Sequence, residues 1–345
     1  MNKEFFKSLL ECPSVSGHEE MIQGKVKQYM NDVVDEFKID NSGSLTSIIN
    51  KESEFKVLLC GHIDEIGFYV NRIYTDGTIG VAKSGGVRPV LYLGTHVQII
   101  GDTIVDGIVM TNLSIESKEK VACSDLRIDI GCDCKEEAEK LVSIGSSVCA
   151  STSWKELQNE RIAARAIDDR GGAFIILEAI RRAKEKGCNI GMYATTTTGE
   201  ETTRRGAFHA ATNHKPDCAI IVDVTFATDY LGARDGENGD VSLGKGAVLC
   251  HSSTVNKKMN QKMEEIAKQH QISYQWEVYP SFTYTDGDTV LLSNQGVPIC
   301  LVSLPLRYMH SSIEMADYKD IEACIELISN FLCEINENTK FTPVL

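Results

Sequence analysis

The sequence predicts an α/β protein in which a small, mostly β module interrupts a larger layered domain. Short, continuous apolar runs, of the kind found in strands buried on both faces, alternate with amphipathic helical stretches in the outer parts of the chain. Between them, residues 70–161 carry short runs separated by Gly, Asp and Asn turns, which is typical of a compact β module. Both ends of this stretch fall inside the α/β pattern, so we expect an insertion and not a tandem domain.

The outer parts of the chain begin with a predicted helix. Ser16 and Glu19 have the spacing of a capping box, and apolar residues follow at helical intervals as far as Val33. Buried strands are predicted at 56–60, 190–195, 218–222 and 298–304, and amphipathic helices at 172–186 and 321–332. Within the insertion, strands are predicted at 78–83, 95–101, 103–111 and 126–131, with one helical stretch at 135–142.

Composition and charge argue against several classes of protein. The 345 residues contain 35 Lys and Arg against 49 Asp and Glu, which gives a formal net charge of −14. Such an acidic chain repels phosphate backbones and anionic lipids, so we expect no nucleic-acid partner and no membrane partner. No stretch has the roughly 18 consecutive apolar residues of a membrane span, and the first residues lack a signal-peptide core. Most of the 12 cysteines sit singly in apolar runs, so a reducing, cytoplasmic location is expected.

The residues that could carry chemistry cluster where predicted strands end. In open α/β sheets the carboxyl ends of the strands converge on one crevice, so side chains far apart in the sequence can meet there. Several acids brought to one rim would repel one another unless cations neutralised them, which favours a divalent metal site. The candidates are His62, Asp64, Glu65, Glu200, Glu201, Asp223 and His310, together with Asp168 and Asp169 at the start of a helix.

Two features leave the metal assignment open at this point. His251 also follows an apolar run, and the residues alone do not rank it below His310. Cys132-x-Cys134 lacks the second thiol pair of a zinc ribbon, so a structural metal there is the weaker interpretation. His62 has a stronger case, because a metal-bound imidazole commonly donates its second N–H to a nearby carboxylate, and Asp64 is the candidate acid.

Five segments occur in an order that resembles a known family. They are GHIDEIGFYV at 61–70, RAIDDRGG at 165–172, GEE and RRGA within 199–207, VDVTFATD at 222–229 and YTDGD to MHSSIEM within 284–315. The resemblance is to the M42 dinuclear-metal aminopeptidases, whose tetrahedral dodecameric members include glutamyl and leucyl aminopeptidases. It implies a zinc-exopeptidase-like, three-layer α/β/α catalytic domain at 1–69 and 162–345. It also implies that residues 70–161 form a barrel-like β domain used in dimerisation.

The resemblance implies a role for each candidate residue. His62 and Asp223 would bind one metal ion, Glu201 and His310 would bind the other, and Asp168 would bridge both. Glu200 matches the general base, and Asp64 matches the acid behind the first histidine. A cis peptide bond between Asp168 and Asp169 is also implied. The chain departs from the family beside the base, where Gly199 replaces the usual Gln and Thr202-Thr203 replaces Val-Gly, so the pocket wall there differs.

We therefore expect a cytoplasmic metalloaminopeptidase that removes N-terminal residues from short peptides. Two divalent cations, Zn²⁺ or Co²⁺, would bridge the attacking water, and Glu200 would take its proton. Self-association is expected, up to a tetrahedral dodecamer built from dimers.

Two alternatives remain beside this function. The same centre could hydrolyse another amide, such as that of an N-acyl amino acid. A non-catalytic metal-binding or assembly protein could keep the fold, although Glu200 argues against it because metal binding does not require a base. The preferred N-terminal residue stays open, since Lys83, Arg88 and Arg204 could favour acidic side chains or could simply be solvated or paired.

Overall fold

The computed structural model describes residues 1–151, 153–233 and 236–343. Its larger part is built on an eight-stranded sheet with the strand order β1-β2-β12-β3-β13-β16-β14-β15. The inner strands β12, β3, β13 and β16 run parallel, so their carboxyl ends meet at one edge. The strands are β1 (Glu36–Ile39), β2 (Leu45–Ile49), β3 (Lys56–His62), β12 (Gly191–Thr197), β13 (Cys218–Phe226), β14 (Ala247–Ser252), β15 (Tyr274–Tyr279) and β16 (Ile299–Leu306). The four predicted buried strands are confirmed as β3, β12, β13 and β16.

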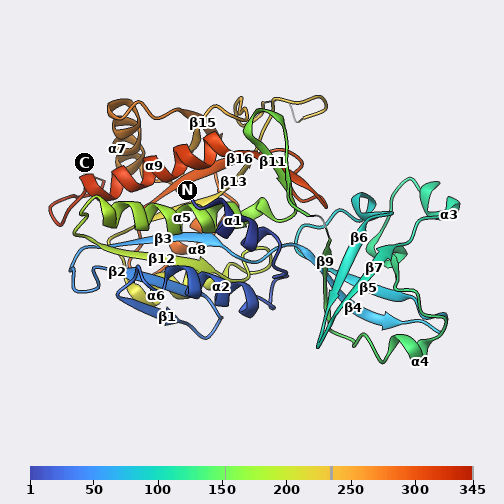
Figure 1. Ribbon diagram of the computed structural model, residues 1–345. Coiled ribbons are helices and arrows are strands. Elements are labelled where there is room, and N and C mark those ends of the chain that lie inside the picture. The colour runs from blue at the N-terminus through green and yellow to red at the C-terminus, as the bar shows by residue number, and fades with distance from the viewer. Residues whose placement is uncertain (152, 234–235, 344–345) are drawn as a thin grey trace.

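Helices cover both faces of this sheet, which confirms the predicted three-layer α/β/α architecture (Figure 1). α5 (Ile167–Glu185) and α9 (Tyr318–Glu334) pack against each other on one face, and α6 (Arg205–His214) lies on the other beside α8 (Gly287–Val290). α9 begins where the Asp317 side chain accepts the backbone N–H of Lys319. The remaining helices of this part are α1 (Lys3–Leu10), α2 (Glu20–Met30) and α7 (Lys257–Gln269).

The predicted capping box at the start of α2 is wrong. Glu19 occupies the N-cap position, and no side chain caps the helix there. The Ser16 hydroxyl instead donates to Oδ2 of Asp64 at 2.5 Å. Ser16 therefore lies before the helix. Its hydrogen bond joins this segment to Asp64, a candidate site residue 48 positions away.

Six antiparallel strands form a closed barrel beside the α/β part (Figure 1). They are β4 (Gly67–Ile73), β5 (Ile79–Ser84), β6 (His96–Ile100), β7 (Ile104–Val109), β8 (Arg127–Asp129) and β9 (Ser147–Ala150), with the short helices α3 (Leu113–Glu116) and α4 (Lys135–Ala138). The barrel has its own apolar cluster, which includes Phe68, Val97 and Ile128. The mostly β character of the insertion is therefore confirmed.

The chain between the barrel and α5 pairs with the α/β part. β10 (Lys155–Glu156) and β11 (Arg161–Ala164) form a three-stranded sheet with β17 (Glu314–Asp317). The barrel strands begin at Gly67 and end at Ala150, whereas domain boundaries were predicted at 70 and 161. The assignment of 70–161 as a dimerisation domain stays a prediction.

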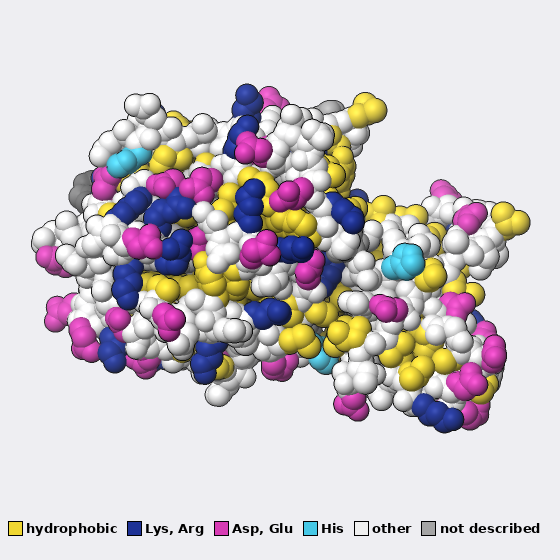
Figure 2. All heavy atoms as spheres, viewed as in Figure 1, with side chains coloured by type: hydrophobic (Ala, Val, Ile, Leu, Met, Phe, Trp, Pro, Cys, Tyr) yellow, Lys and Arg dark blue, Asp and Glu magenta, His cyan; other side chains and the backbone are white. Residues whose placement is uncertain are grey.

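The molecular surface carries charges of both signs. On the face in Figure 2, Lys and Arg side chains are interspersed with Asp and Glu over the α/β part, and hydrophobic side chains are visible on both the α/β part and the barrel. The exposed apolar residues of the barrel region include Val90, Ile104, Ile108, Leu113 and Ile144. In the described part of the chain, no helix combines the length and the apolar character that a membrane crossing needs.

Candidate metal centre

The parallel strands and the start of α5 bring five distant side chains together at one edge of the sheet. His62 is the last residue of β3, and Asp223 lies within β13. Glu201 follows the end of β12, and His310 follows the end of β16. Asp168 belongs to the first turn of α5, which packs over β3 and β13. All five line one cavity of about 820 Å³.

Asp168 lies between two histidines. Its Oδ1 is 3.1 Å from Nε2 of His62, and its Oδ2 is 3.3 Å from Nε2 of His310. The same Nε2 of His310 is 3.6 Å from Oε1 of Glu201. One oxygen of Asp168 therefore faces His62 and the other faces His310. A carboxylate that bridges two metal ions needs this arrangement.

Two groups of potential ligand atoms share His62. One consists of His62, Asp168 and Glu201, and the other of His62, Asp169 and Asp223, with the ligand atoms of each group within 4.8 Å of one another. His310 joins the first group through its contacts with Asp168 and Glu201. The peptide bond between Asp168 and Asp169 is cis, which agrees with the resemblance.

The electrostatics of this cluster fit divalent cations. Burial raises the pKa values of Glu201 and Asp223 well above the ordinary carboxyl range, and neighbouring acids raise them further. Burial opposes ionisation of Asp168 as well, but hydrogen bonds with His310 and His62 hold its pKa below the usual range. A set of buried carboxylates and imidazoles is a typical donor set for zinc and similar cations, whose charge would offset this mutual repulsion.

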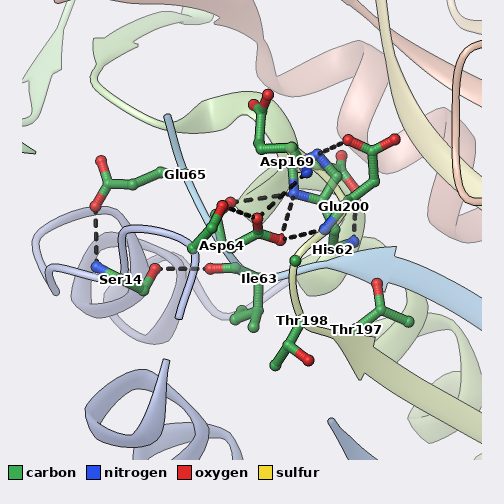
Figure 3. A network of polar contacts seen from close by, with 12 residues as sticks. Ser14, His62, Ile63, Asp64, Glu65, Asp169, Thr197, Thr198 and Glu200 are labelled. Atoms are coloured by element: carbon green, nitrogen blue, oxygen red, sulfur yellow. Dashed lines mark hydrogen bonds and ion pairs between the residues drawn. The ribbon is translucent and has the colours of Figure 1, made fainter. Parts of the chain in front are cut away.

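Asp64 lies behind His62 and fixes the neighbouring loop. Its Oδ1 is 3.5 Å from Nδ1 of His62, while the backbone carbonyl of Asp64 lies closer to that nitrogen, at 3.1 Å. Its carboxylate also accepts the backbone N–H groups of Glu200 and Glu201, at 3.0 and 3.3 Å. Asp64 therefore positions both the histidine and the two glutamates, and Figure 3 shows it between His62 and Glu200 and the N-terminal segment.

The neighbouring acid Glu65 has a different role. Its side chain points toward Ser14, away from His62, and accepts the Ser14 backbone N–H at 3.0 Å (Figure 3). Arg165 and Arg170 both form ion pairs with the Glu65 carboxylate, and all three side chains are buried. Glu65 is thus a structural residue that joins the N-terminal segment to the start of α5.

Glu200 stands at the rim of the cluster. Its Oε2 is 4.0 Å from Nε2 of His62, and its Oε1 accepts a hydrogen bond from Nε of Arg204 at 2.8 Å. Burial raises the pKa of Glu200, and the charges of His62 and Arg204 oppose that shift. The carboxylate therefore has one oxygen held by Arg204 and the other directed toward the cluster.

Sequence reasoning missed Glu314. This buried residue of β17 accepts the backbone N–H of Asp168 through Oε2 and that of His310 through Oε1, both at 3.0 Å. It therefore holds two candidate ligands in place by their backbones. Its position after His310 in the MHSSIEM segment was the available signal, but the pairing with Asp168 depends on the fold.

His251, which the sequence alone could not rank below His310, does not join the cluster. His251 lies in β14, is exposed, and stacks on the ring of Trp276 at 4.0 Å between ring centroids. The cavity is lined by His62 and His310 and not by His251. The structure thus separates the two histidines that the sequence left equivalent.

Comparisons with known proteins agree with this arrangement. The structure superimposes on the TET aminopeptidase of a Thaumarchaeota archaeon from marine sediment with a TM-score of 0.91, at 30% identity over 97% of this chain and 96% of that chain. It also resembles the TET1 peptidase of Pyrococcus horikoshii, described as assembling into a tetrahedron or a large octahedral shell, with a TM-score of 0.86, 27% identity, and coverage of 96% and 99%. Fold and site thus define a peptidase of the aminopeptidase class.

The sequence comparison gives the family. The model described as M42 glutamyl aminopeptidase matches residues 43–327, and the chain belongs to that family. A lysyl aminopeptidase from Pyrococcus furiosus is 33% identical over an alignment of 351 positions that covers 99% of each chain. Peptidases of this family are metal-dependent, and the cluster of His, Asp and Glu described above could hold a metal ion.

Proposed function

We propose that the protein is a dinuclear metalloaminopeptidase that removes N-terminal residues from short peptides. The position of Asp168, with one oxygen toward His62 and the other toward His310, carries this proposal. His62 and Asp223 would hold one cation, Glu201 and His310 the other, and Asp168 both. The mixed nitrogen and carboxylate donors suit Zn²⁺ or Co²⁺. When bound, the cations supply Lewis acidity that polarises the scissile carbonyl and lowers the pKa of water.

Glu200 is proposed as the general base. Its Oε2 faces the cluster and accepts a proton from the attacking water, and the same oxygen then gives that proton to the leaving amine nitrogen. Asp64 supports this step by holding the backbone N–H of Glu200. Arg204 fixes the other carboxylate oxygen, so that the base has a defined orientation.

A substrate panel tests this function. We expect the enzyme to hydrolyse aminoacyl-anilides and short peptides with a free α-amine, to lose activity after metal removal, and to regain it with Zn²⁺ or Co²⁺. The N-acetylated forms of the same substrates are the matched control. Preferential turnover of the acetylated forms would support the deacylase alternative, and inactivity of the metal-loaded protein toward every amide would contradict the proposal.

We also propose that the barrel mediates self-association, up to a dodecamer built from dimers. It contributes none of the proposed ligands, and it exposes several apolar side chains, which are typical of an interface. The similarity to assembling TET peptidases supports this proposal. The described cysteines are free and most are buried, which supports a cytoplasmic location.

A further inference from the structure

One acidic side chain in the wall of the cavity has no role in the proposed catalysis. Glu277 lies in β15, is 2% exposed, and lines the cavity together with Thr225 and Ser303. Ser303 is paired in register with the proposed ligand Asp223 on the neighbouring strand. Glu277 therefore shares the cavity with the candidate metal centre, but it is separate from the proposed ligand set.

The partners of Glu277 are hydroxyl groups. Ser303 Oγ donates to Oε1 at 2.9 Å, and Thr225 Oγ1 donates to Oε2. Burial raises the pKa of Glu277 to about 7, and the hydrogen bonds from Thr225 and Ser303 oppose the shift. Among the described residues, no Lys or Arg forms an ion pair with Glu277. A buried carboxylate that lacks a cationic partner is costly, so a cation placed beside it would be strongly favoured.

Arg204, the cationic side chain of the cavity in the described part of the chain, is already paired. Among the described lining residues, Arg204 is the only Lys or Arg. Its Nε contacts Glu200 at 2.8 Å, and its Nη1 is 3.8 Å from Asp288. Besides the proposed ligands and base, the exposed Glu237 joins Glu277 as an acid of the described lining. Arg88 donates to the backbone carbonyl of Met309. These pairings argue against a subsite for acidic side chains.

We propose that Glu277 is the specificity-determining residue of a subsite for a cationic N-terminal side chain, that of Lys or Arg. The inference rests on the proposed aminopeptidase function. The carboxylate and its two hydroxyl partners would receive the ammonium or guanidinium group inside the cavity, next to the centre that cleaves the first peptide bond. A hydrogen bond between charged groups is worth roughly 10- to 100-fold in selectivity.

The test compares side chains that differ in charge. Lys-anilide and norleucine-anilide differ in the terminal ammonium group, and Glu-anilide carries the opposite charge. For the wild-type protein we expect kcat/KM for Lys to exceed that for norleucine by about 10- to 100-fold, and that for Glu to be lowest. Glu277→Gln should reduce the Lys to norleucine ratio toward one. Glu265→Gln, an exposed acid of α7, is the matched control and should keep the wild-type ratio.

The outcomes separate the two proposals. Equal turnover of Lys and norleucine substrates by the wild-type protein, or an unchanged ratio in folded Glu277→Gln, would overturn the subsite and leave the aminopeptidase function intact. Failure to cleave any free-amine substrate would overturn both. If Glu277→Gln does not fold, the wild-type ratio, together with competitive inhibition by free lysine against free norleucine, still decides the question, because equal inhibition constants contradict the subsite.

Discussion

Arg204 donates a hydrogen bond from Nε to Oε1 of Glu200 at 2.8 Å. The contact spans four residues and depends on the left-handed backbone of Arg204, which has φ of 56° just before α6. It occurs where the chain departs from the usual family pattern beside the base. The cation that the sequence offered as a determinant for acidic substrates is thus attached to the proposed base.

Replacing Arg204 should change the pH dependence of catalysis. Burial raises the pKa of Glu200, and the Arg204 guanidinium counteracts that effect. Arg204→Leu should therefore raise the pKa further, so that a higher pH is needed to ionise the base. We expect the acidic limb of the kcat/KM profile to move to higher pH. Arg205→Leu, which removes the next cation along the chain, should leave the limb in place, and an unmoved limb in Arg204→Leu would refute the coupling.

The adjacent glutamates should respond differently to the same change. Glu201→Gln should weaken or empty one metal site, because a neutral amide is a poorer ligand than a carboxylate. Glu200→Gln should retain both metals but lower kcat by roughly 10²- to 10⁴-fold, the usual effect of losing a general base. Elemental analysis beside kcat measurements checks both variants. Metal loss in Glu200→Gln, or full activity there, would show that the assignment is reversed.

Glu314 should matter for metal binding although it is no proposed ligand. Its two oxygens hold the backbones of Asp168 and His310. Glu314→Gln leaves one oxygen to accept these bonds, so we expect metal affinity to fall by about 10- to 100-fold. Competition with a chelator measures the affinity. Glu322→Gln, whose carboxylate pairs with Arg182 on the outer helices, is the control and should bind metal normally.

His214 should make the fold sensitive to acid. Burial lowers the pKa of His214 to about 4, and Lys38 and Lys56 contribute to the shift. An unfolded histidine titrates near 6.5, so below that pH the unfolded chain binds the proton first. The contribution of neutral His214 to the free energy of unfolding is therefore complete above about pH 6.5. It is lost as the pH falls toward 4. The decrease in Tm between pH 7.5 and pH 5 should be smaller in His214→Gln than in wild type or in His209→Gln, and equal decreases would contradict this.

The barrel surface should control assembly. Ile104 and Ile108 of β7 are 49% and 46% exposed, and both lie on the outer side of the barrel. The double variant Ile104→Glu and Ile108→Glu would place two charges in a barrel interface, so sedimentation velocity should detect smaller species. Met21→Glu, at an exposed apolar residue of α2, should sediment like the wild type. Wild-type sedimentation of the folded double variant would exclude this face of the barrel.

Patterns of apolar residues were sufficient for the architecture. The continuous runs before His62 and Asp223 predicted strands β3 and β13, because strands buried on both faces require such runs. Ser16 shows where the pattern was insufficient. Its spacing to Glu19 suits a helix cap, but a hydroxyl can form the same kind of bond with a distant carboxylate, and Asp64 receives it.

By itself, the sequence determined the α/β class, the β insertion, the family and the candidate metal ligands and general base. These follow from local periodicity and from ordered motifs. Only the tertiary structure decided which polar atoms meet: Glu314 holds the backbone of Asp168 across 146 positions, and Glu65 turns toward Ser14 and away from the centre. Such pairings depend on strand order and on the direction of each side chain, and neither is encoded by residue type at a single position.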